Sequence, residues 1–563
     1  MNKRKVICIG LDGATFDLIH PWAGAGQLPH LERIMDDGVW GELASVMPPI
    51  SAPAWTSFMT GKNPGKHGIF GFTKQMRGSY EARFVNRKLI KAETLWKGLG
   101  DRGKKVIVVN VPITYPPEEV NGCLVSGMDA PSTKSMYAYP PELRDEIDRV
   151  TRGQYRIHLH LGGYLINEKR KREAIDEILS AIDARTRVAQ YLLEKYPWDF
   201  FMIKFDNPDQ VQHYFWHDMN QEGSMVQNAI LRVYQHLDST LGRLMTYMDE
   251  NTALLIVSDH GAGPLNGKRI YINEWLRRKG LFFTTDHSDG KKRRFASGGR
   301  VKKLFSDALE KVYFDAGKII SYRVRNRLGM SFSVMKAKLH AFASSLNTDW
   351  TKTKAYFGGN LSAIYVNLQG REPHGIVKPG EEYEQVREDI IRGLESLVDP
   401  DDGDPVFDRV FRKEEVYHGP ELEEAPDILF FPRNFSDYTV GKKVLKDDKK
   451  PVIARYPSPK GVTANHRPNG IFLAKGKSIK KGGQIKGASI IDVFPTIYHM
   501  FGLEIPGDID GSTLAAIFTP EWLAEHPVRF STMATSIEEA QGDVYSEEDK
   551  EAIRQRLSGL GYI

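Results

Sequence analysis

The sequence has few cysteines, no long apolar run and little net charge. Its 563 residues include only Cys8 and Cys123, which excludes a disulfide-stabilised secreted fold. The apolar run near the start is too short for a signal peptide, and no segment reaches the roughly 18 apolar residues of a transmembrane helix. We therefore expect a soluble cytoplasmic protein, large enough for one α/β domain with insertions or for several average domains.

Residues 254–261 read LLIVSDHG, which is typical of a buried parallel strand that ends in Asp259 and His260. Open α/β sheets bind ligands beyond the carboxyl ends of their strands, and adjacent Asp and His side chains are metal-ligand types. We expect Gly261 and Gly263 to let the backbone turn there. Asp-His pairs are also common in turns, so this interpretation depends on other strands that end in the same way.

Two other apolar runs end in acids. Residues 6–11 predict a strand followed by Asp12, a natural partner for Asp259, although an N-cap role is the alternative for an Asp in such a turn. After the apolar residues 200–205, a helix that starts at Pro208 would project Asp209 and His213 from one face, one turn apart. A solvated helix face is the alternative for this pair, and two nearby residues compete as ligands: Asp206 and His217.

A cluster of hydroxyl side chains lies within residues 48–72. Pro49 and Pro53 stiffen the backbone around Ser51, and residues 54–59 predict a helix just behind it. A hydroxyl near a helix N-terminus faces unpaired N–H groups that suit a phosphate, so Ser51 is a candidate nucleophile activated by a metal. A cap or loop hydrogen bond is the alternative role for it. Three other hydroxyls compete with it: Thr56, Ser57 and Thr60.

Two later segments complete the pattern. His466 lies in a loop flanked by Gly, Asn and Pro, just before the apolar strand predicted within residues 469–475. The apolar run over residues 490–503 predicts a helix that ends at Gly502.

Residues 290–345 carry fourteen Lys or Arg side chains against three acids, a formal excess of +11 where the whole chain has +5. Apolar residues recur there at helical spacing, which predicts a basic amphipathic helix. It could act as a lid for an anionic substrate, lie on an anionic membrane surface, or pack on the core with a solvated basic face, and we favour the last over membrane contact. Nucleic-acid binding is not expected because no binding module accompanies the charge.

The ordered motifs resemble the alkaline phosphatase superfamily and, within it, the type I phosphodiesterase/nucleotide pyrophosphatase branch. They run from Asp12-Gly13 through SAPAWTSFMTG and NPGKHGI to DQVQH, SDHG and HRP. This resemblance implies an α/β fold, a three-layer αβα sandwich with a mostly parallel central sheet and an inserted helical cap. It places a catalytic core at 1–275 and 350–519, the basic cap at 276–349 and a peripheral tail at 520–563.

The resemblance also assigns roles to the candidate residues. Counting ten residues back from Gly61 selects Ser51 as the nucleophile. Two divalent metal ions are implied, and their mixed His and Asp ligands suit Zn²⁺ best, while Mn²⁺ fits the same ligand types. The first ion would be held by Asp12, Asp259, His260 and Ser51, and the second by Asp209, His213 and His466.

Two departures from the superfamily patterns restrict the activity. Phe72 stands where many nucleotide pyrophosphatases place an Asn that binds a phosphoryl oxygen, which weakens the case for nucleotide diester hydrolysis. Trp55 stands where sulfatases need Arg, which argues against a sulfatase.

We therefore expect a phosphoric ester hydrolase that acts on a small-molecule phosphate ester through a phosphoserine. A phosphomutase is the alternative enzyme, and a non-catalytic binding protein is the third hypothesis. The sequence leaves the substrate and the oligomeric state open.

Overall fold

The computed structural model describes residues 4–159, 161, 168–285, 348–358, 362–435, 437–445, 449–456, 461–532 and 544–560. The basic helix expected within residues 290–345, and most of the cap expected at 276–349, lie outside the described residues. None of the described helices has both the length and the apolar composition that a membrane span requires.

A ten-stranded sheet forms the centre of the molecule, in the order β20-β2-β19-β9-β1-β8-β5-β6-β7, with β21 paired to β2. Its four middle strands run parallel and are almost entirely buried: β9 (Thr252–Val257), β1 (Lys5–Leu11), β8 (Phe200–Phe205) and β5 (Val106–Val111). Their runs of Val, Ile, Leu and Phe are typical of strands covered on both faces. The strands predicted from these apolar runs are confirmed.

The outer strands make the sheet mixed. Antiparallel pairing joins β19 (Asn469–Lys475) to both β9 and β2 (Val39–Ala44), and β7 (Ala138–Tyr139) to β6 (Gly122–Ser126). Two short strands pair parallel with β2: β20 (Gly483–Gln484) and β21 (Ala488–Ser489). Most pairings are parallel, as the fold class predicts.

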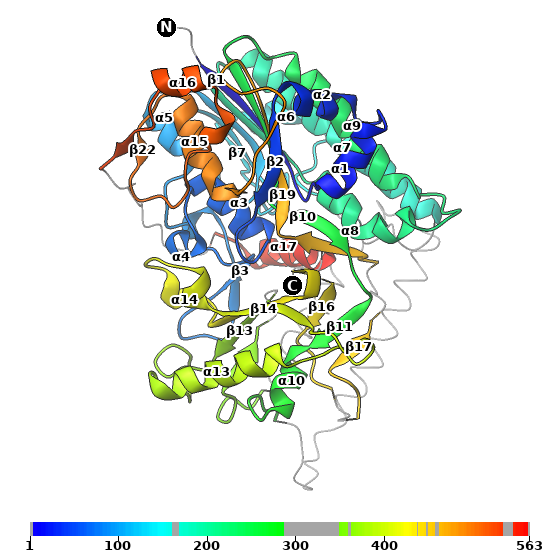
Figure 1. Ribbon diagram of the computed structural model, residues 1–563, viewed down its shortest axis with the longest axis vertical. Helices are drawn as coiled ribbons and strands as arrows, with labels where there is room; N and C mark the ends of the chain where they lie inside the picture. The colour runs from blue at the N-terminus through cyan, green and yellow to red at the C-terminus, as the bar shows by residue number, and fades with distance from the viewer. Residues whose placement is uncertain are drawn as a thin grey trace.

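Helices cover both faces of this sheet, so the core is a three-layer sandwich (Figure 1). One side carries α1 (Phe16–Gly24), α2 (Pro29–Asp37), α7 (Glu168–Lys195) and α9 (Ala229–Met245). The other side carries α3 (Ser51–Thr60), α5 (Leu95–Asp101) and α15 (Val493–Met500). The helix predicted over 490–503 is confirmed as a 3-10 turn followed by α15, and Gly502 adopts a left-handed φ of 69° just beyond it.

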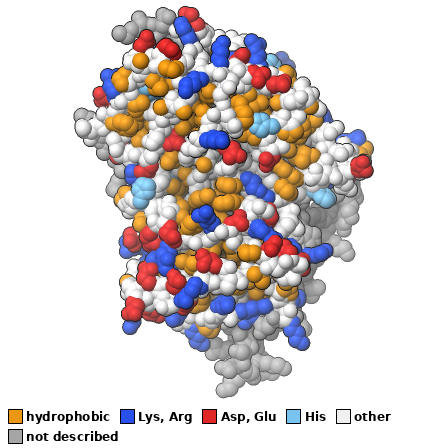
Figure 2. Space-filling view, in the orientation of Figure 1, with side chains coloured by type: hydrophobic (Ala, Val, Ile, Leu, Met, Phe, Trp, Pro, Cys, Tyr) orange, Lys and Arg blue, Asp and Glu red, His pale blue; other side chains and the backbone are white. Residues whose placement is uncertain are grey.

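A second, smaller sheet lies below the first in Figure 1 and has its own hydrophobic cluster. It consists of β12 (Ala355–Phe357), β13 (Ala363–Val366), β15 (Ile428–Pro432) and β14 (Phe407–Arg412). The exposed side of α13 (Glu381–Glu395) packs ion pairs of both signs, and Figure 2 shows acidic and basic side chains mixed over this region. A three-stranded sheet adjoins it: β16 (Tyr438–Gly441), β11 (Lys268–Tyr271) and β17 (Ile453–Arg455).

The last described helix, α17 (Glu547–Leu560), packs on the main core, to which Tyr545, Ile553 and Leu557 belong. The boundaries expected at 275, 350 and 519 stay predictions. The remaining described elements are short, apart from α8, β10 and β18, which are described with the site: α4 (Pro64–His67), α6 (Leu143–Thr151), α10 (Ile272–Arg278), α14 (Lys413–Val416), α16 (Pro520–Glu525), β3 (Thr73–Gln75), β4 (Ala82–Phe84), β22 (Ile505–Pro506) and β23 (Phe530–Ser531).

Candidate active site

The candidate ligands gather where three neighbouring strands end. β1 lies between β8 and β9, so their carboxyl ends share one edge of the sheet. Asp12 directly follows β1, and Asp259 and His260 follow β9. After β8 the chain enters α8 (Asn207–Met219), whose first turn contains a Pro, as predicted.

The first cluster consists of Asp12, Asp259 and His260, whose ligand atoms all lie within 4.8 Å of one another. His260 Nε2 is 3.2 Å from Asp259 Oδ2 and 3.6 Å from Asp12 Oδ1. Gly13 donates its N–H to Asp259 Oδ1 across 3.3 Å, which helps to orient that carboxylate. All three ligand side chains are buried.

The second cluster consists of Asp209, His213 and His466, and it is equally compact and buried. His213 Nε2 lies 3.2 Å from Asp209 Oδ1 and 3.2 Å from His466 Nε2. His466 Nε2 lies 3.5 Å from the same Asp209 oxygen. Gly13 has a left-handed φ of 67°, and a Cβ there would lie 3.0 Å from Asp209 Oδ1, so a glycine permits the close approach of the two clusters.

His466 reaches the site by strand pairing. It lies in β18 (Ala464–Arg467), which pairs antiparallel with β10 (Gly261–Pro264) so that His466 is opposite Ala262. The sequence predicts a loop at His466 and a turn at Gly261 and Gly263, and both predictions are wrong. A Cβ at Gly261 would lie 2.2 Å from the carbonyl oxygen of Asn469, so this glycine admits a neighbouring strand.

Ser51 is the first residue of α3 and is buried beside the first cluster. Its Oγ lies 3.2 Å from His260 Nε2 and donates to Asp12 Oδ1 across 3.5 Å. The competing hydroxyls bond elsewhere. Thr56 and Thr60 each donate to a carbonyl oxygen of their own helix at 2.7 Å, and Ser57 Oγ lies 2.9 Å from His67 Nε2.

Backbone carbonyl oxygens orient all three histidines. The Nδ1 atoms of His213 and His466 lie 2.8 Å from the carbonyl oxygens of Ala464 and Pro49, and His260 Nδ1 lies 3.0 Å from that of Gly261. Because a carbonyl oxygen can only accept, each Nδ1 carries the proton and each neutral ring presents an unprotonated Nε2 to its cluster. This is the tautomer that a metal ligand requires.

The clusters also contain acceptors that lack donors. Asp209 Oδ1 and Asp259 Oδ2 are fully buried and accept no hydrogen bond from the described residues. A buried carboxylate oxygen without a donor is costly, and a divalent cation would satisfy both atoms. The donor set of three carboxylates and three Nε2 atoms therefore fits two metal ions.

The electrostatics of the two clusters differ. Burial and the nearby Asp259 carboxylate raise the pKa of Asp12 to about 7, and burial likewise raises the pKa of Asp259 to about 7. Burial opposes ionisation of Asp209 too, but His213 and His466 hold its pKa well below its usual range. Burial and the neighbouring His260 lower the pKa of His466 to about 4, which keeps that ring neutral.

The sequence candidates do not include Lys204 and Trp55, which both contact Asp12. Lys204 forms an ion pair with Asp12 Oδ2, and Trp55 Nε1 donates to the same oxygen across 3.3 Å. A single Lys in the otherwise apolar strand FFMIKF is the signal that could have found the first of them. Asp206 also pairs with Lys204 and belongs to neither cluster, and His217 is exposed on α8.

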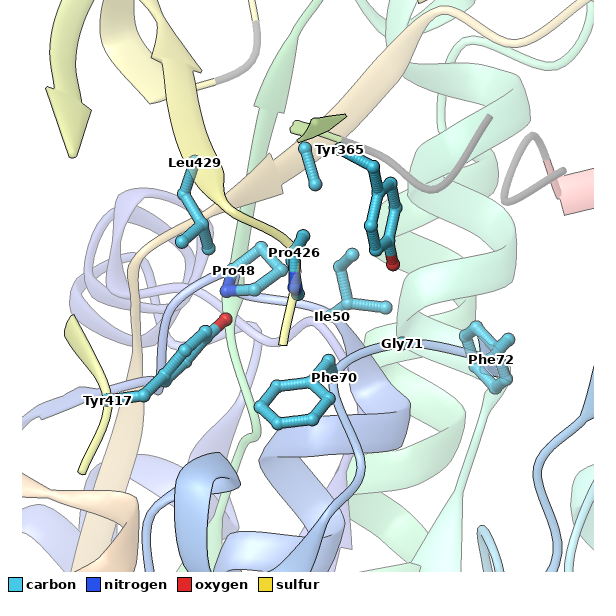
Figure 3. A pocket seen from close by; sticks show the side chains of 10 residues that line it. Pro48, Ile50, Phe70, Gly71, Phe72, Tyr365, Tyr417, Pro426 and Leu429 are labelled. Atoms are coloured by element: carbon cyan, nitrogen blue, oxygen red, sulfur yellow. The ribbon is translucent and has the colours of Figure 1, made fainter. Parts of the chain in front are cut away.

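An apolar hollow opens beside the nucleophile (Figure 3). One wall includes Ile50, which precedes Ser51, and Phe72, the residue at the position where the resemblance expects Asn. The other wall comes from the second sheet and its connections. The lining residues are Pro48, Ile50, Phe70, Gly71, Phe72, Ala363, Tyr365, Tyr417, Pro426 and Leu429.

Residues 6–450 match the family model described as type I phosphodiesterase / nucleotide pyrophosphatase. The chain belongs to this family. The family resemblance seen in the sequence is therefore confirmed, and the protein is a hydrolase that acts on phosphoric ester bonds. The family consists of enzymes with two metal ions, and this member has two candidate clusters to hold them.

Solved structures support the fold of this phosphodiesterase family member. Phosphonoacetate hydrolase from Sinorhizobium meliloti 1021 is 16% identical with a TM-score of 0.51, over 87% of this chain and 94% of that one. Human ectonucleotide pyrophosphatase/phosphodiesterase 5 is 14% identical with a TM-score of 0.46, over 92% of this chain and 100% of that one. A search of curated proteins finds no match. The alkaline-phosphatase-like α/β fold expected from the sequence is confirmed.

Proposed function

We propose that this hydrolase is metal-dependent and uses Ser51 as its nucleophile, with one divalent ion in each Asp/His cluster. The observation that carries the proposal is the position of Ser51 Oγ, which lies 3.2 Å from His260 Nε2 of the first cluster. His466 of the second cluster stacks on the same His260 ring, so both clusters flank the nucleophile. A phosphoryl group placed there would meet ligands of both ions.

The chemistry follows from this arrangement. Two bound divalent ions lower the pKa of a nearby hydroxyl and offset the charge of the phosphoryl group. Ser51 Oγ attacks phosphorus as its proton leaves, the bond to the leaving alcohol breaks, and a phosphoserine forms. Water then attacks this phosphorus, the Ser51 O–P bond breaks, and the hydroxyl regains a proton. Asp12 and His260 orient the Ser51 hydroxyl throughout.

The ligand set points to the kind of ion and of substrate. Three imidazoles and three carboxylates suit Zn²⁺ best, and Mn²⁺ accepts the same ligand types. Small-molecule phosphate esters are the substrates that we propose. Phe72 provides no amide for a phosphoryl oxygen, which is why we do not assign nucleotide diesters to this site.

The test is hydrolysis of chromogenic phosphomonoester and phosphodiester substrates by metal-stripped protein reloaded with Zn²⁺ or Mn²⁺. We expect activity to return with metal and to fall about 10³-fold or more in Ser51→Ala, which keeps its bound metal. Thr56→Ala is the matched control because Thr56 bonds within α3, and its activity should stay near wild type. Full activity in Ser51→Ala, or a protein that binds no metal, would contradict the proposal.

A further inference from the structure

Lys204 is a buried lysine at the centre of the sheet. It lies on β8, is 1% exposed, and is surrounded in sequence by Phe, Met and Ile. A Cβ at Gly10 would lie 3.1 Å from Lys204 Cγ, so the lysine stem fills the space that this glycine leaves. Burying an ammonium group is costly unless anions pair with it, so its partners deserve examination.

Its partners form a chain of side chains with alternating charge. Lys204 Nζ forms ion pairs with Asp12 Oδ2 and Asp206 Oδ1. The other oxygen of Asp206 lies 3.2 Å from the guanidinium of Arg185 on α7 and accepts from Asn110 Nδ2 across 3.1 Å. The chain Arg185, Asp206, Lys204, Asp12 thus links helix α7 to the first metal-ligand cluster.

The two oxygens of Asp12 consequently have different surroundings. Oδ2 contacts both Lys204 and the indole N–H of Trp55, while Oδ1 faces Ser51 Oγ and His260 Nε2 at 3.5 and 3.6 Å. Only Oδ1 is directed at the first cluster as a ligand atom. Because Asp206 contacts the same ammonium and offsets its charge, the main effect of Lys204 on a nearby cation is to orient Asp12.

We propose that Lys204 is a positioning residue that fixes Asp12 for the ion of the first cluster and not for that of the second. The second cluster does not depend on this chain, because backbone carbonyl oxygens orient His213 and His466. The inference rests on the proposed function, since it takes the two clusters as metal sites. Residues that orient metal ligands typically contribute 10- to 100-fold to affinity.

The experiment is a calorimetric titration of metal-free Lys204→Met with Zn²⁺, beside the wild type. We expect two ions per wild-type chain, and in the variant one ion of unchanged affinity and one bound about 10- to 100-fold more weakly. Hydrolysis by the variant should fall at limiting Zn²⁺ and recover at higher Zn²⁺. Asp259→Asn, which removes a ligand of the first cluster, identifies which of the two affinities belongs to it.

Asp206→Asn keeps the lysine but removes its second anion, so it should weaken the same ion by a smaller factor. It also keeps the proposal testable if Lys204→Met does not fold. The matched control is Lys413→Met, another buried lysine, whose ammonium lies 3.6 Å from Asp427 near the second sheet, and both ions should bind it as in the wild type.

Equal weakening of both ions, tighter binding at the first cluster, or unchanged binding in both variants would overturn the role of Lys204. A wild-type chain that binds no ions would contradict the proposed function itself, and the two failures are thereby distinguishable.

Discussion

The imidazole rings of His260 and His466 stack face to face, with ring centroids 3.7 Å apart and an interplanar angle of 18°. The two residues belong to different metal-ligand clusters and reach each other through the pairing of β10 with β18. Burial lowers the pKa of both rings, so two neutral imidazoles stack without charge repulsion. The stack keeps the two clusters side by side, at the distance that a shared phosphoryl group requires.

Replacing His466 with Ala should remove one of two bound ions and abolish hydrolysis, because Asp209 and His213 alone supply too few ligands. Metal content of the purified variant, measured by atomic emission, checks this. His217→Ala is the matched control, since His217 is exposed on the same helix as His213 and belongs to neither cluster. Two ions in His466→Ala would refute the assignment of the second cluster.

Gly10→Ala should destabilise the protein by about 1–3 kcal/mol, because the added Cβ would lie 2.6 Å from Trp55 Cη2 in a fully packed core. Urea unfolding followed by circular dichroism gives the difference. Gly24→Ala is the control, because nothing lies within 4 Å of a Cβ at the end of α1, and it should raise the free energy of unfolding by at most about 1 kcal/mol. Equal effects of the two substitutions would show that the contact is relieved at no cost.

The free energy of unfolding should fall as the pH is lowered below about 6.5, partly because of His67. Burial lowers the pKa of His67 to about 3, so between these values the unfolded chain binds a proton that the folded chain does not. One such group contributes a slope of up to about 1.4 kcal/mol per pH unit.

The prediction is checked by comparing the wild type with His67→Gln in urea at pH 7, 6 and 5. Nδ1 of His67 accepts from the N–H of Ile69, and Gln can supply that acceptor without titrating. The wild type should lose more stability than the variant over this range. Identical slopes would mean that His67 is protonated in the folded protein.

Much of the core could be predicted from local sequence. The apolar runs that end at Asp12 and Asp259 are strands, and the helix predicted from Pro208 places Asp209 and His213 one turn apart. These predictions hold because strand runs and helix starts depend on residues close together in the chain. The ordered motifs further indicated the family that the sequence match confirms.

Other features could not be predicted, for identifiable reasons. Ser51, Thr56, Ser57 and Thr60 are alike in sequence, and only their hydrogen-bond partners in the fold distinguish them. The strand at His466 exists because β10 pairs with it, and no local pattern encodes that pairing. Nor does the sequence separate the strands of the second sheet from those of the central one.

The sequence by itself determined the residue types available for chemistry and the elements on which they lie. The tertiary structure alone decided which of them meet: the strand order β9-β1-β8 places Asp12 between Asp259 and Asp209, and Lys204 contacts Asp12 from the next strand. The physical reason is range. Backbone propensity and apolar periodicity act within a few residues, whereas ligand geometry arises from packing between segments far apart in the chain.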